Sequence, residues 1–304
     1  MIKKIFKKLI PKQVYLLLKA IKYKPLNTFP LGHYYSPIVS KNDFKEFEKQ
    51  IWEEVENKTL QGINLHPEKQ LSLIKEFEKY YQEMPFEYEP SLDRRYCFNN
   101  SSYEYTDAII LYSFIRHFNP KNIIEIGSGY SSAVMLDTKD IFKMDTKHTF
   151  IEPYPKLLYS LFKGNDKNDC KVFDTKVQNV PLKEFTKLER NDILFIDSSH
   201  VSKSGSDVNF ELFKILPNLN SGVIIHFHDV FYPFEYPKEW VIGGRNWNEN
   251  YMLRAFLSYN NEFEILFFSH YMHKHFKEAF ENMPLTYKNT GGSLWIVKKC
   301  HVLK

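Results

Sequence analysis

The 304-residue sequence predicts an α/β protein in which a mostly helical N-terminal extension precedes a doubly wound parallel sheet. Short apolar runs recur at regular intervals after residue 105, with helical segments between them, as expected of strands buried on both faces. These runs lie at 122–126, 148–152, 171–173, 192–197, 222–227, 262–268 and 293–298. A capping-box-like pattern at Asp43 and Glu46 predicts a helix over 43–58, and helical spacing of apolar residues predicts another over 67–81. We assign residues 1–95 to this extension and residues 96–304 to the sheet domain.

Charge is distributed unevenly, because the net charge is +4 while residues 1–42 hold nine Lys and no Asp or Glu. The rest of the chain lacks the basic stripe of nucleic-acid binders, so we expect no nucleic-acid partner. Three distant cysteines, Cys97, Cys170 and Cys300, indicate neither a disulfide framework nor a cysteine metal site. No apolar run is long enough to span a bilayer and no signal-peptide cleavage site follows, which predicts a cytoplasmic location.

The basic start of the chain predicts an amphipathic helix. Ile2, Ile5, Phe6 and Leu9 recur at helical spacing with lysines between them. Such a helix suits the anionic inner surface of a membrane, which predicts a peripheral membrane contact through residues 1–24. The alternative is a helix docked on the enzyme body or a frayed terminus, and Pro11 would interrupt the helix early.

The most specific motif is IIEIGSGYSS at residues 123–132, where the first strand of the predicted sheet leads into a helix. Glycines let the backbone turn sharply and approach a ligand, while the helix offers free N–H groups. A pyrophosphate-binding loop favours a third glycine where Ser132 stands. It also has little use for an acid at Glu125, whereas a carboxylate there suits a cation such as a methionyl ammonium.

Further candidates follow the second and third strands. Glu152 ends the second strand, where an acid can accept hydrogen bonds from the ribose hydroxyls of an adenosine. The alternative for Glu152 is a solvated strand-end carboxylate. Gln178, after the third strand, is expected to line the adenine. The predicted cofactor-binding residues are Glu125, Gly127, Ser128, Gly129, Ser131, Glu152, Gln178 and Asp197.

With these motifs, residues 105–300 resemble the class I S-adenosylmethionine-dependent methyltransferases. The resemblance implies a seven-stranded, mostly parallel Rossmann-like sheet of order 3-2-1-4-5-7-6, with the last strand antiparallel. It also implies S-adenosylmethionine as the cofactor, lying across the carboxyl ends of strands 1, 2 and 4. Two alternatives stay open: an NAD(P)-dependent oxidoreductase, against which Ser132 and Glu125 argue, and a non-catalytic scaffold, against which the intact glycines and acids argue.

The fourth and fifth strands both end in acids and histidines, and in an open α/β sheet these ends point into one crevice. Methyl transfer to a poorly acidic hydroxyl requires removal of its proton, a task that suits a histidine with a pKa of about 6.5. His200, Asp197 and His228 are therefore the predicted catalytic residues. His226, in contrast, is expected to pack in the core.

The same segments are similar to the catechol and macrocin-type sugar O-methyltransferases, in which acids at these strand ends hold magnesium. The resemblance implies metal positions for Asp197, His228 and Asp229, and it places His200 where the catechol enzymes have a catalytic lysine. His228 departs from that pattern, because magnesium prefers oxygen ligands. Either a softer divalent ion such as Mn²⁺, Fe²⁺ or Zn²⁺ binds, or no metal does.

A long aromatic connection follows Asp229, and connections of this length within a compact domain are usually lids or binding loops. Aromatic rings beside Arg and Asn suit a sugar, so we expect a small polar or glycan acceptor. The predicted acceptor-binding residues are Tyr232, Arg245, Trp247 and Asn248, with Tyr103, Glu104 and Asp107 bordering the same cleft. The alternative is a rigid packed insertion. The sequence thus predicts an S-adenosylmethionine-dependent O-methyltransferase.

Overall fold

The computed structural model describes residues 11, 14–15, 18, 28–52 and 58–299. The chain divides into two compact units, Met1–Glu54 and Val55–Lys304. The first unit contains helix α3 (Lys41–Trp52), while the predicted membrane-contacting helix at residues 1–24 lies almost entirely outside the described residues. Among the described helices, none is both long enough and apolar enough to cross a membrane.

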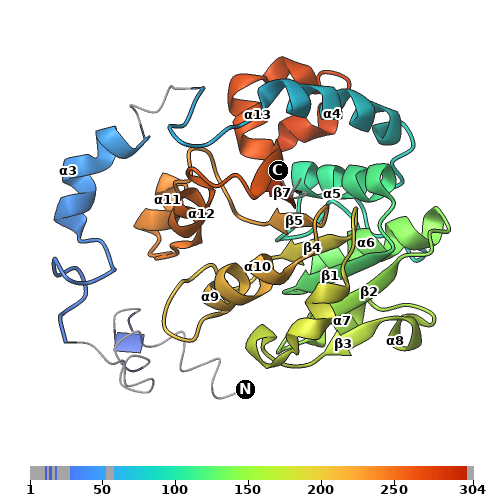
Figure 1. The fold of residues 1–304 in the computed structure, drawn as a ribbon, viewed down its shortest axis with the longest axis horizontal. Coiled ribbons are helices and arrows are strands. Elements are labelled where there is room, and N and C mark those ends of the chain that lie inside the picture. Colours follow the sequence, from blue (N-terminus) through green and yellow to red (C-terminus); the bar gives the residue numbers. More distant parts are fainter. Residues whose placement is uncertain (1–10, 12–13, 16–17, 19–27, 53–57, 300–304) are drawn as a thin grey trace, which may run out of the picture. The chain divides into compact units, whose positions relative to one another are not determined.

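The second unit is built on a seven-stranded sheet of order β3-β2-β1-β4-β5-β7-β6 (Figure 1). Strands β1 to β5 pair in parallel, and β7 runs antiparallel to both β5 and β6. The predicted strand order and the antiparallel last strand are therefore confirmed. The strands are β1 (Asn122–Ile126), β2 (Lys147–Ile151), β3 (Lys171–Phe173), β4 (Ile193–Ile196), β5 (Ile224–Phe227), β6 (Phe263–Phe268) and β7 (Leu294–Lys298).

Helices connect successive strands of the parallel part, as a doubly wound sheet requires (Figure 1). The α-helices are α4 (Pro67–Tyr81), α5 (Tyr105–Phe118), α6 (Tyr130–Ile141), α7 (Lys156–Leu161), α8 (Asp166–Asp169), α9 (Asp207–Phe210), α10 (Leu216–Asn218), α11 (Lys238–Ile242), α12 (Glu249–Leu257) and α13 (Ser269–His275). A π-helical segment spans Glu211–Ile215, and short 3-10 segments span Val177–Asn179, Leu182–Lys187, Lys277–Phe280 and Pro284–Lys288.

The centre of the sheet forms the core of this unit. Every residue of β4 and β5 is buried, which is why these strands read as continuous apolar runs in the sequence. The ring of Trp295 on β7 stacks on Phe114 of α5, with centroids 3.8 Å apart. His226 is fully buried and stacks against Phe195 at 4.0 Å and Trp295 at 4.5 Å, so it packs in the core as expected.

Helix α4 belongs to this packing, although it lies before residue 95. The fully buried side chain of Gln70 accepts a hydrogen bond from the backbone N–H of Phe268 at 2.7 Å, at the end of β6. The Tyr112 hydroxyl of α5 donates to the Tyr80 carbonyl of α4 at 3.1 Å. Two directional polar contacts therefore fix α4 against both α5 and the sheet edge.

A buried arginine fixes the segment that leads into α5. The Arg95 guanidinium bonds the Asp166 carboxylate of α8 with two nitrogens, at 2.8 and 2.9 Å, and the Asp137 carboxylate of α6 at 2.8 Å. Its side chain is 5% exposed. Buried charges are stable only when they are paired in this way, so the residues before α5 have a defined position.

We expect His148 on β2 to make the stability of the fold sensitive to acid. Its side chain is 2% exposed and has no hydrogen-bond partner among the described residues. Burial lowers the pKa of His148 to about 3. The unfolded chain, with a histidine pKa of about 6.5, binds more protons over the interval between these values. Stability contributed by the neutral ring is therefore present above about pH 6.5 and is lost as the pH falls toward about 3.

We expect His148→Phe to make the free energy of unfolding less dependent on pH, by up to about 1.4 kcal/mol per pH unit in this interval. Urea unfolding of both proteins from pH 7 to pH 4.5 measures the difference. Parallel pH profiles for wild type and variant would contradict the assignment.

Candidate functional site

A cavity of about 380 Å³ opens at the carboxyl ends of β1, β2 and β4, where ligands bind in open α/β sheets. Four of the predicted cofactor-binding residues line it, namely Gly127, Glu152, Gln178 and Asp197. Its wall also includes Lys176, Lys203 and Asp207, so charges of both signs face the space. The position and the size of this cavity suit a nucleoside cofactor.

Gly127 brings the end of β1 against the end of β4. Its φ is +81°, and a Cβ at this position would overlap the carbonyl oxygen of Asp197. The Gly127 N–H donates to the carbonyl of Ile151 at 3.0 Å, and the Asp197 N–H donates to the carbonyl of Ile126 at 2.8 Å. Only glycine fits this turn, both for its backbone angle and for its close contact.

Glu152 shapes the rim of the same cavity. Its carboxylate accepts hydrogen bonds from the backbone N–H of Ser128 at 3.2 Å and of Tyr154 at 2.7 Å. The Gln178 side chain, which also lines the cavity, donates to the Gly205 carbonyl at 2.9 Å. Both predicted nucleoside contacts are therefore held by backbone groups at the cavity wall.

Glu125 points away from this cavity and into the start of α6. It is fully buried and accepts hydrogen bonds from the hydroxyls of Ser131 and Ser132, both at 2.5 Å. Burial raises the pKa of Glu125 to about 8, against the lowering effect of these two hydrogen bonds. Ser132 also accepts from the Gly129 N–H at 3.1 Å. Glu125 thus secures the first turn of α6, and its contact with a methionyl ammonium stays a prediction.

Acids and histidines gather where β4 and β5 end. One oxygen of Asp197, one oxygen of Asp229 and a ring nitrogen of His200 lie within 4.8 Å of one another, a spacing that could hold a metal ion. His200 Nε2 is 3.3 Å from Asp197 Oδ1 and 3.6 Å from Asp229 Oδ2. We call this three-residue group the acid–histidine cluster; its histidine is His200, whereas the metal site predicted from the sequence included His228, which stays a prediction.

A further carboxylate lies behind His200. Glu249, at the start of α12, is 2% exposed and approaches His200 Nδ1 at 2.8 Å. Carboxylates behind metal-binding histidines are common, because they fix the ring orientation and leave the other nitrogen free to bind. The sequence assigned Glu249 no role of its own, since no regular spacing relates residue 249 to residue 200.

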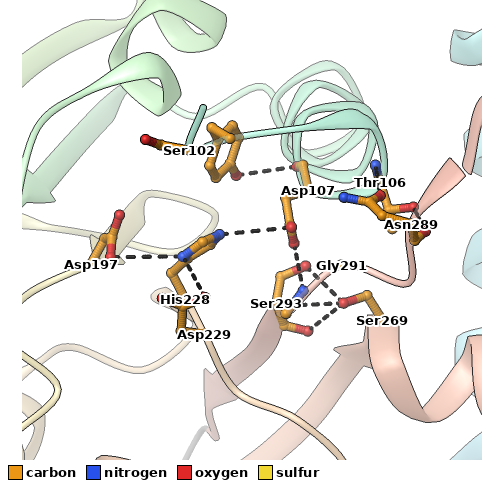
Figure 2. Close-up of polar contacts among 12 residues, drawn as sticks. Ser102, Thr106, Asp107, Asp197, His228, Asp229, Ser269, Asn289, Gly291 and Ser293 are labelled. Carbon is orange, nitrogen blue, oxygen red and sulfur yellow. Dashed lines mark hydrogen bonds and ion pairs between the residues drawn. The ribbon is translucent and has the colours of Figure 1, made fainter. Parts of the chain in front are cut away.

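His228 lies beside the acid–histidine cluster. Its Nδ1 is 3.5 Å from Asp229 Oδ1 and 3.7 Å from Asp197 Oδ1, while its Nε2 is 3.8 Å from Asp107 Oδ2. Figure 2 shows Asp107 reaching from α5 toward the ring of His228. The side chain of His228 is buried, and neither ring nitrogen has a hydrogen-bond partner among the described residues.

Electrostatics couple these groups. Burial opposes charge on His200, yet its hydrogen bonds to Asp197 and Glu249 raise its pKa to about 10. The pKa of His228 is also raised well above its usual value, because the effect of Asp229 and Asp197 outweighs burial. In return, His228 and His200 hold the pKa of Asp197 below its usual value despite burial. The imidazoles therefore act as counter-charges to the carboxylates.

Two residues of the acid–histidine cluster have uncommon backbone angles. His200 has φ +59° and Asp229 has φ +58°, in the left-handed region that non-glycine residues seldom adopt. The N–H groups of Asn248 and Glu249 both donate to the His200 carbonyl, at 3.1 and 3.2 Å. The start of α12 therefore holds His200 in a conformation of the kind that concentrates at functional sites.

A second cavity, of about 210 Å³, adjoins the cluster. It is lined by His228 and Asp229 together with Asp107, Ser101, Ser102, Glu104, Phe231, Trp240, Asn289, Thr290, Gly291 and Gly292. Asp197 lines the first cavity, whereas Asp229 lines the second. The acid–histidine cluster thus lies between the two cavities.

Of the predicted acceptor-binding residues, Trp247 contacts the acid–histidine cluster through its side chain, and the side chains of the others pack elsewhere. Tyr232 is 2% exposed, with its ring 5.0 Å from that of Tyr271. Arg245 covers the ring of Trp240 at 4.0 Å, Trp247 lies 4.4 Å from the ring of His200, and Asn248 accepts from the Ser202 N–H at 2.6 Å. Within the described part of the chain, Tyr232, Arg245, Trp247 and Asn248 line neither cavity. Two other residues of the same connection, Phe231 and Trp240, line the second cavity.

We expect Gly127→Ala to lower the affinity for S-adenosylhomocysteine by more than about tenfold, because the methyl group would push β1 away from Asp197 and displace the cavity wall. Gly164→Ala is the matched control, since Gly164 also has a positive φ but would place its Cβ in open space. Both variants bear backbone strain of about 1–3 kcal/mol. Calorimetric titration and thermal unfolding separate the two effects, and equal affinities would contradict this role of Gly127.

Several known proteins are similar to this chain. Residues 124–230 match the family described as a methyltransferase domain. An uncharacterized protein of Archaeoglobus fulgidus is 35% identical over 174 residues, which cover 54% of this chain and 76% of that protein. The SAH-bound methyltransferase PaMTH1 of Podospora anserina is 17% identical, with a TM-score of 0.43 over 75% of this chain and 88% of that chain.

A protein of Klebsiella pneumoniae, provisionally assigned as an O-methyltransferase, is 14% identical, with a TM-score of 0.40 over 76% of this chain and 90% of that chain. The family assignment depends on the sequence matches alone. The glycine turn after β1 and the cavity beside it lie within or next to the matched residues. The chain belongs to the class I S-adenosylmethionine-dependent methyltransferases.

Proposed function

We propose that this methyltransferase transfers the methyl group to a hydroxyl of a small polar acceptor, with carbohydrates as the leading class. The observation that carries the proposal is the position of the acid–histidine cluster between the two cavities. A sulfonium bound in the first cavity and an acceptor bound in the second would meet at Asp197 and Asp229.

The reaction requires a bond between the acceptor oxygen and the methyl carbon to form as the bond between that carbon and sulfur breaks. The acceptor also loses its hydroxyl proton, so the products are a methyl ether, S-adenosylhomocysteine and a proton. The protein must align the two reactants and receive the proton.

The donor set of the cluster suits a divalent metal ion. Asp197 and Asp229 offer one oxygen each, and His200 offers Nε2 because Glu249 lies at its Nδ1. A bound ion would lower the pKa of an acceptor hydroxyl that coordinates it. An imidazole ligand beside carboxylates favours Mn²⁺, Fe²⁺ or Zn²⁺ over Mg²⁺.

We propose that His228 receives the proton, in its neutral form, after a metal ion bound at the cluster has replaced the imidazolium as counter-charge to the carboxylates. Asp107 lies at its Nε2 and can orient the ring, while Nδ1 faces the cluster. An acid that orients a histidine base is a common catalytic arrangement. His200, by comparison, has carboxylates at both ring nitrogens, which fits a metal ligand better than a base acting on the acceptor. In the first cavity, Glu152 would bind the ribose and Gln178 would face the adenine.

The proposal is tested with tritiated S-adenosylmethionine and a panel of sugars, polyols and catechols. We expect label in a base-stable methyl ether of at least one sugar or polyol. Label found only in amines, or no binding of S-adenosylhomocysteine by calorimetry, would overturn the proposal.

We expect Mn²⁺ to bind the chelator-treated protein more tightly than Mg²⁺, and Glu249→Gln to weaken Mn²⁺ binding by about 10- to 100-fold, because the ring of His200 loses its anionic partner. Calorimetric titration measures both. Asp145→Asn, at an exposed site before β2, should leave the affinity unchanged. Equal Mn²⁺ affinity in the wild type and Glu249→Gln proteins would argue against a metal at this cluster.

We expect Asp229→Asn to reduce the rate of methyl transfer by about 100-fold or more. The affinity for S-adenosylhomocysteine should stay within about twofold, because Asp229 lines the second cavity and not the first. Single-turnover assays and calorimetry measure the two quantities. A parallel loss of cofactor affinity would place Asp229 in the cofactor site instead.

A further inference from the structure

We propose that the second cavity selects a hydroxyl acceptor that carries a protonated amine, such as an amino sugar. The inference rests on the proposed O-methyl transfer at the neighbouring cluster, and it concerns the recognition of the acceptor. It draws on the rigidity of the cavity wall, an unpartnered buried side chain, the charges that line the space and the aromatic rings beside them.

The wall of the cavity joins two distant parts of the chain. The Asn289 side-chain oxygen accepts from the Thr106 N–H at 2.9 Å, at the start of α5. The Gly292 N–H donates to Asp107 Oδ1 at 3.0 Å (Figure 2). Gly291 has φ +65°, and a Cβ there would lie 2.9 Å from Asp107 Oδ1. The segment before β7 is thus fitted closely to α5 and holds the carboxylate of Asp107 in place.

His228 provides a polar group that the protein itself leaves without a hydrogen bond. Its side chain is 8% exposed and lines the cavity. Its nearest carboxylate oxygens are 3.5 to 3.8 Å away, beyond hydrogen-bond distance, and neither nitrogen has a partner among the described residues. A buried polar group in this state calls for a ligand, and a hydroxyl in the cavity can supply the missing hydrogen bond.

The described residues that line the cavity include three acids, and His228 is the basic side chain among them. Glu104, Asp107 and Asp229 face the cavity, and no lysine or arginine is among the described residues that line it. Asp107 and Asp229 lie close to His228, whereas Glu104 is exposed and its carboxylate makes no hydrogen bond or ion pair with any described residue. An anionic acceptor would be repelled here, and a cationic group would be attracted, most strongly beside Glu104.

These positions give the acceptor an orientation. His228 and Asp229 lie at the end that adjoins the cluster, where the reacting hydroxyl must be, while Glu104 is the accessible carboxylate. Phe231 and Trp240 contribute aromatic rings 5.2 Å apart, and the hydroxyls of Ser101, Ser102 and Thr290 can bond further hydroxyls. A ring with several hydroxyls and one ammonium group matches this lining in both polarity and charge.

The test compares methyl β-glucosaminide, methyl β-glucoside and methyl β-glucuronide, which share a ring and differ in charge. Each is titrated calorimetrically into the protein that has been saturated with S-adenosylhomocysteine and Mn²⁺. We expect the glucosaminide to bind about tenfold more tightly than the glucoside, and the glucuronide to bind most weakly.

Glu104→Gln should weaken binding of the glucosaminide by about five- to tenfold and leave binding of the glucoside unchanged, because only the ammonium contact depends on charge. Glu104→Lys should invert the order and favour the glucuronide. Glu189→Gln is the control, since Glu189 is an exposed acid before the amino end of β4, away from both cavities. Thermal unfolding checks that all three variants are folded.

Equal binding of the three sugars, including binding of none, overturns the proposal, as does a loss of glucoside affinity in Glu104→Gln equal to that of the glucosaminide. Titrations of the protein with S-adenosylhomocysteine and with Mn²⁺, made before the sugars are added, distinguish this failure from a failure of the proposed function. If S-adenosylhomocysteine and Mn²⁺ bind but charge makes no difference, only the acceptor class is wrong. If neither binds, the proposed function itself fails.

Discussion

The contact on which the site depends is the close approach of β1 and β4 at Gly127 and Asp197. The backbone N–H of Asp197 bonds the end of β1, and Gly127 has no side chain to hold the two strand ends apart. This single turn sets the floor of the first cavity and directs Asp197 toward the crevice. A side chain at residue 127 would alter both at once, because they share one stretch of backbone.

Electrostatic compensation is the second constraint. Several carboxylates come together at buried or partly buried positions, and unpaired charges are costly there. The two imidazoles of His200 and His228 are the groups that balance them, with Glu249 and Asp107 at their outer nitrogens. The acid–histidine cluster can also exchange protons for a cation. Metal binding requires neutral imidazole, so a bound ion displaces the imidazole protons and takes their place as counter-charge.

Residues far apart in the chain complete the site. Helix α5 contributes Asp107 from its first turn, and helix α12 begins with Glu249. Two helix N-termini that are distant in the sequence therefore lie beside the ends of β4 and β5. The segment before β7 ties α5 in place through Asn289 and Gly292. Reaction chemistry and acceptor recognition are therefore coupled, because the second cavity is formed by the elements that hold the histidines.

The family assignment bears on the alternative protein classes that the sequence left open, an oxidoreductase and a non-catalytic scaffold. The methyltransferase match covers the glycine turn and continues through the ends of β4 and β5. An oxidoreductase that uses the same sheet topology is no longer needed to explain the motif. Ser132 and Glu125, which argued against it, bond each other at the start of α6, and Glu152 at the cavity rim is held by backbone N–H groups.

The sequence by itself determined the strands, their order through the family resemblance, and the residues that follow each strand end, such as Gly127, Asp197 and Asp229. These features follow from local periodicity and from the rule that parallel strand ends share one crevice. Only the tertiary structure decided that Glu125 faces α6, that Tyr232 is buried, and that Glu249 lies behind His200. Such contacts depend on how long connections pack against the sheet, and no spacing along the chain records that packing.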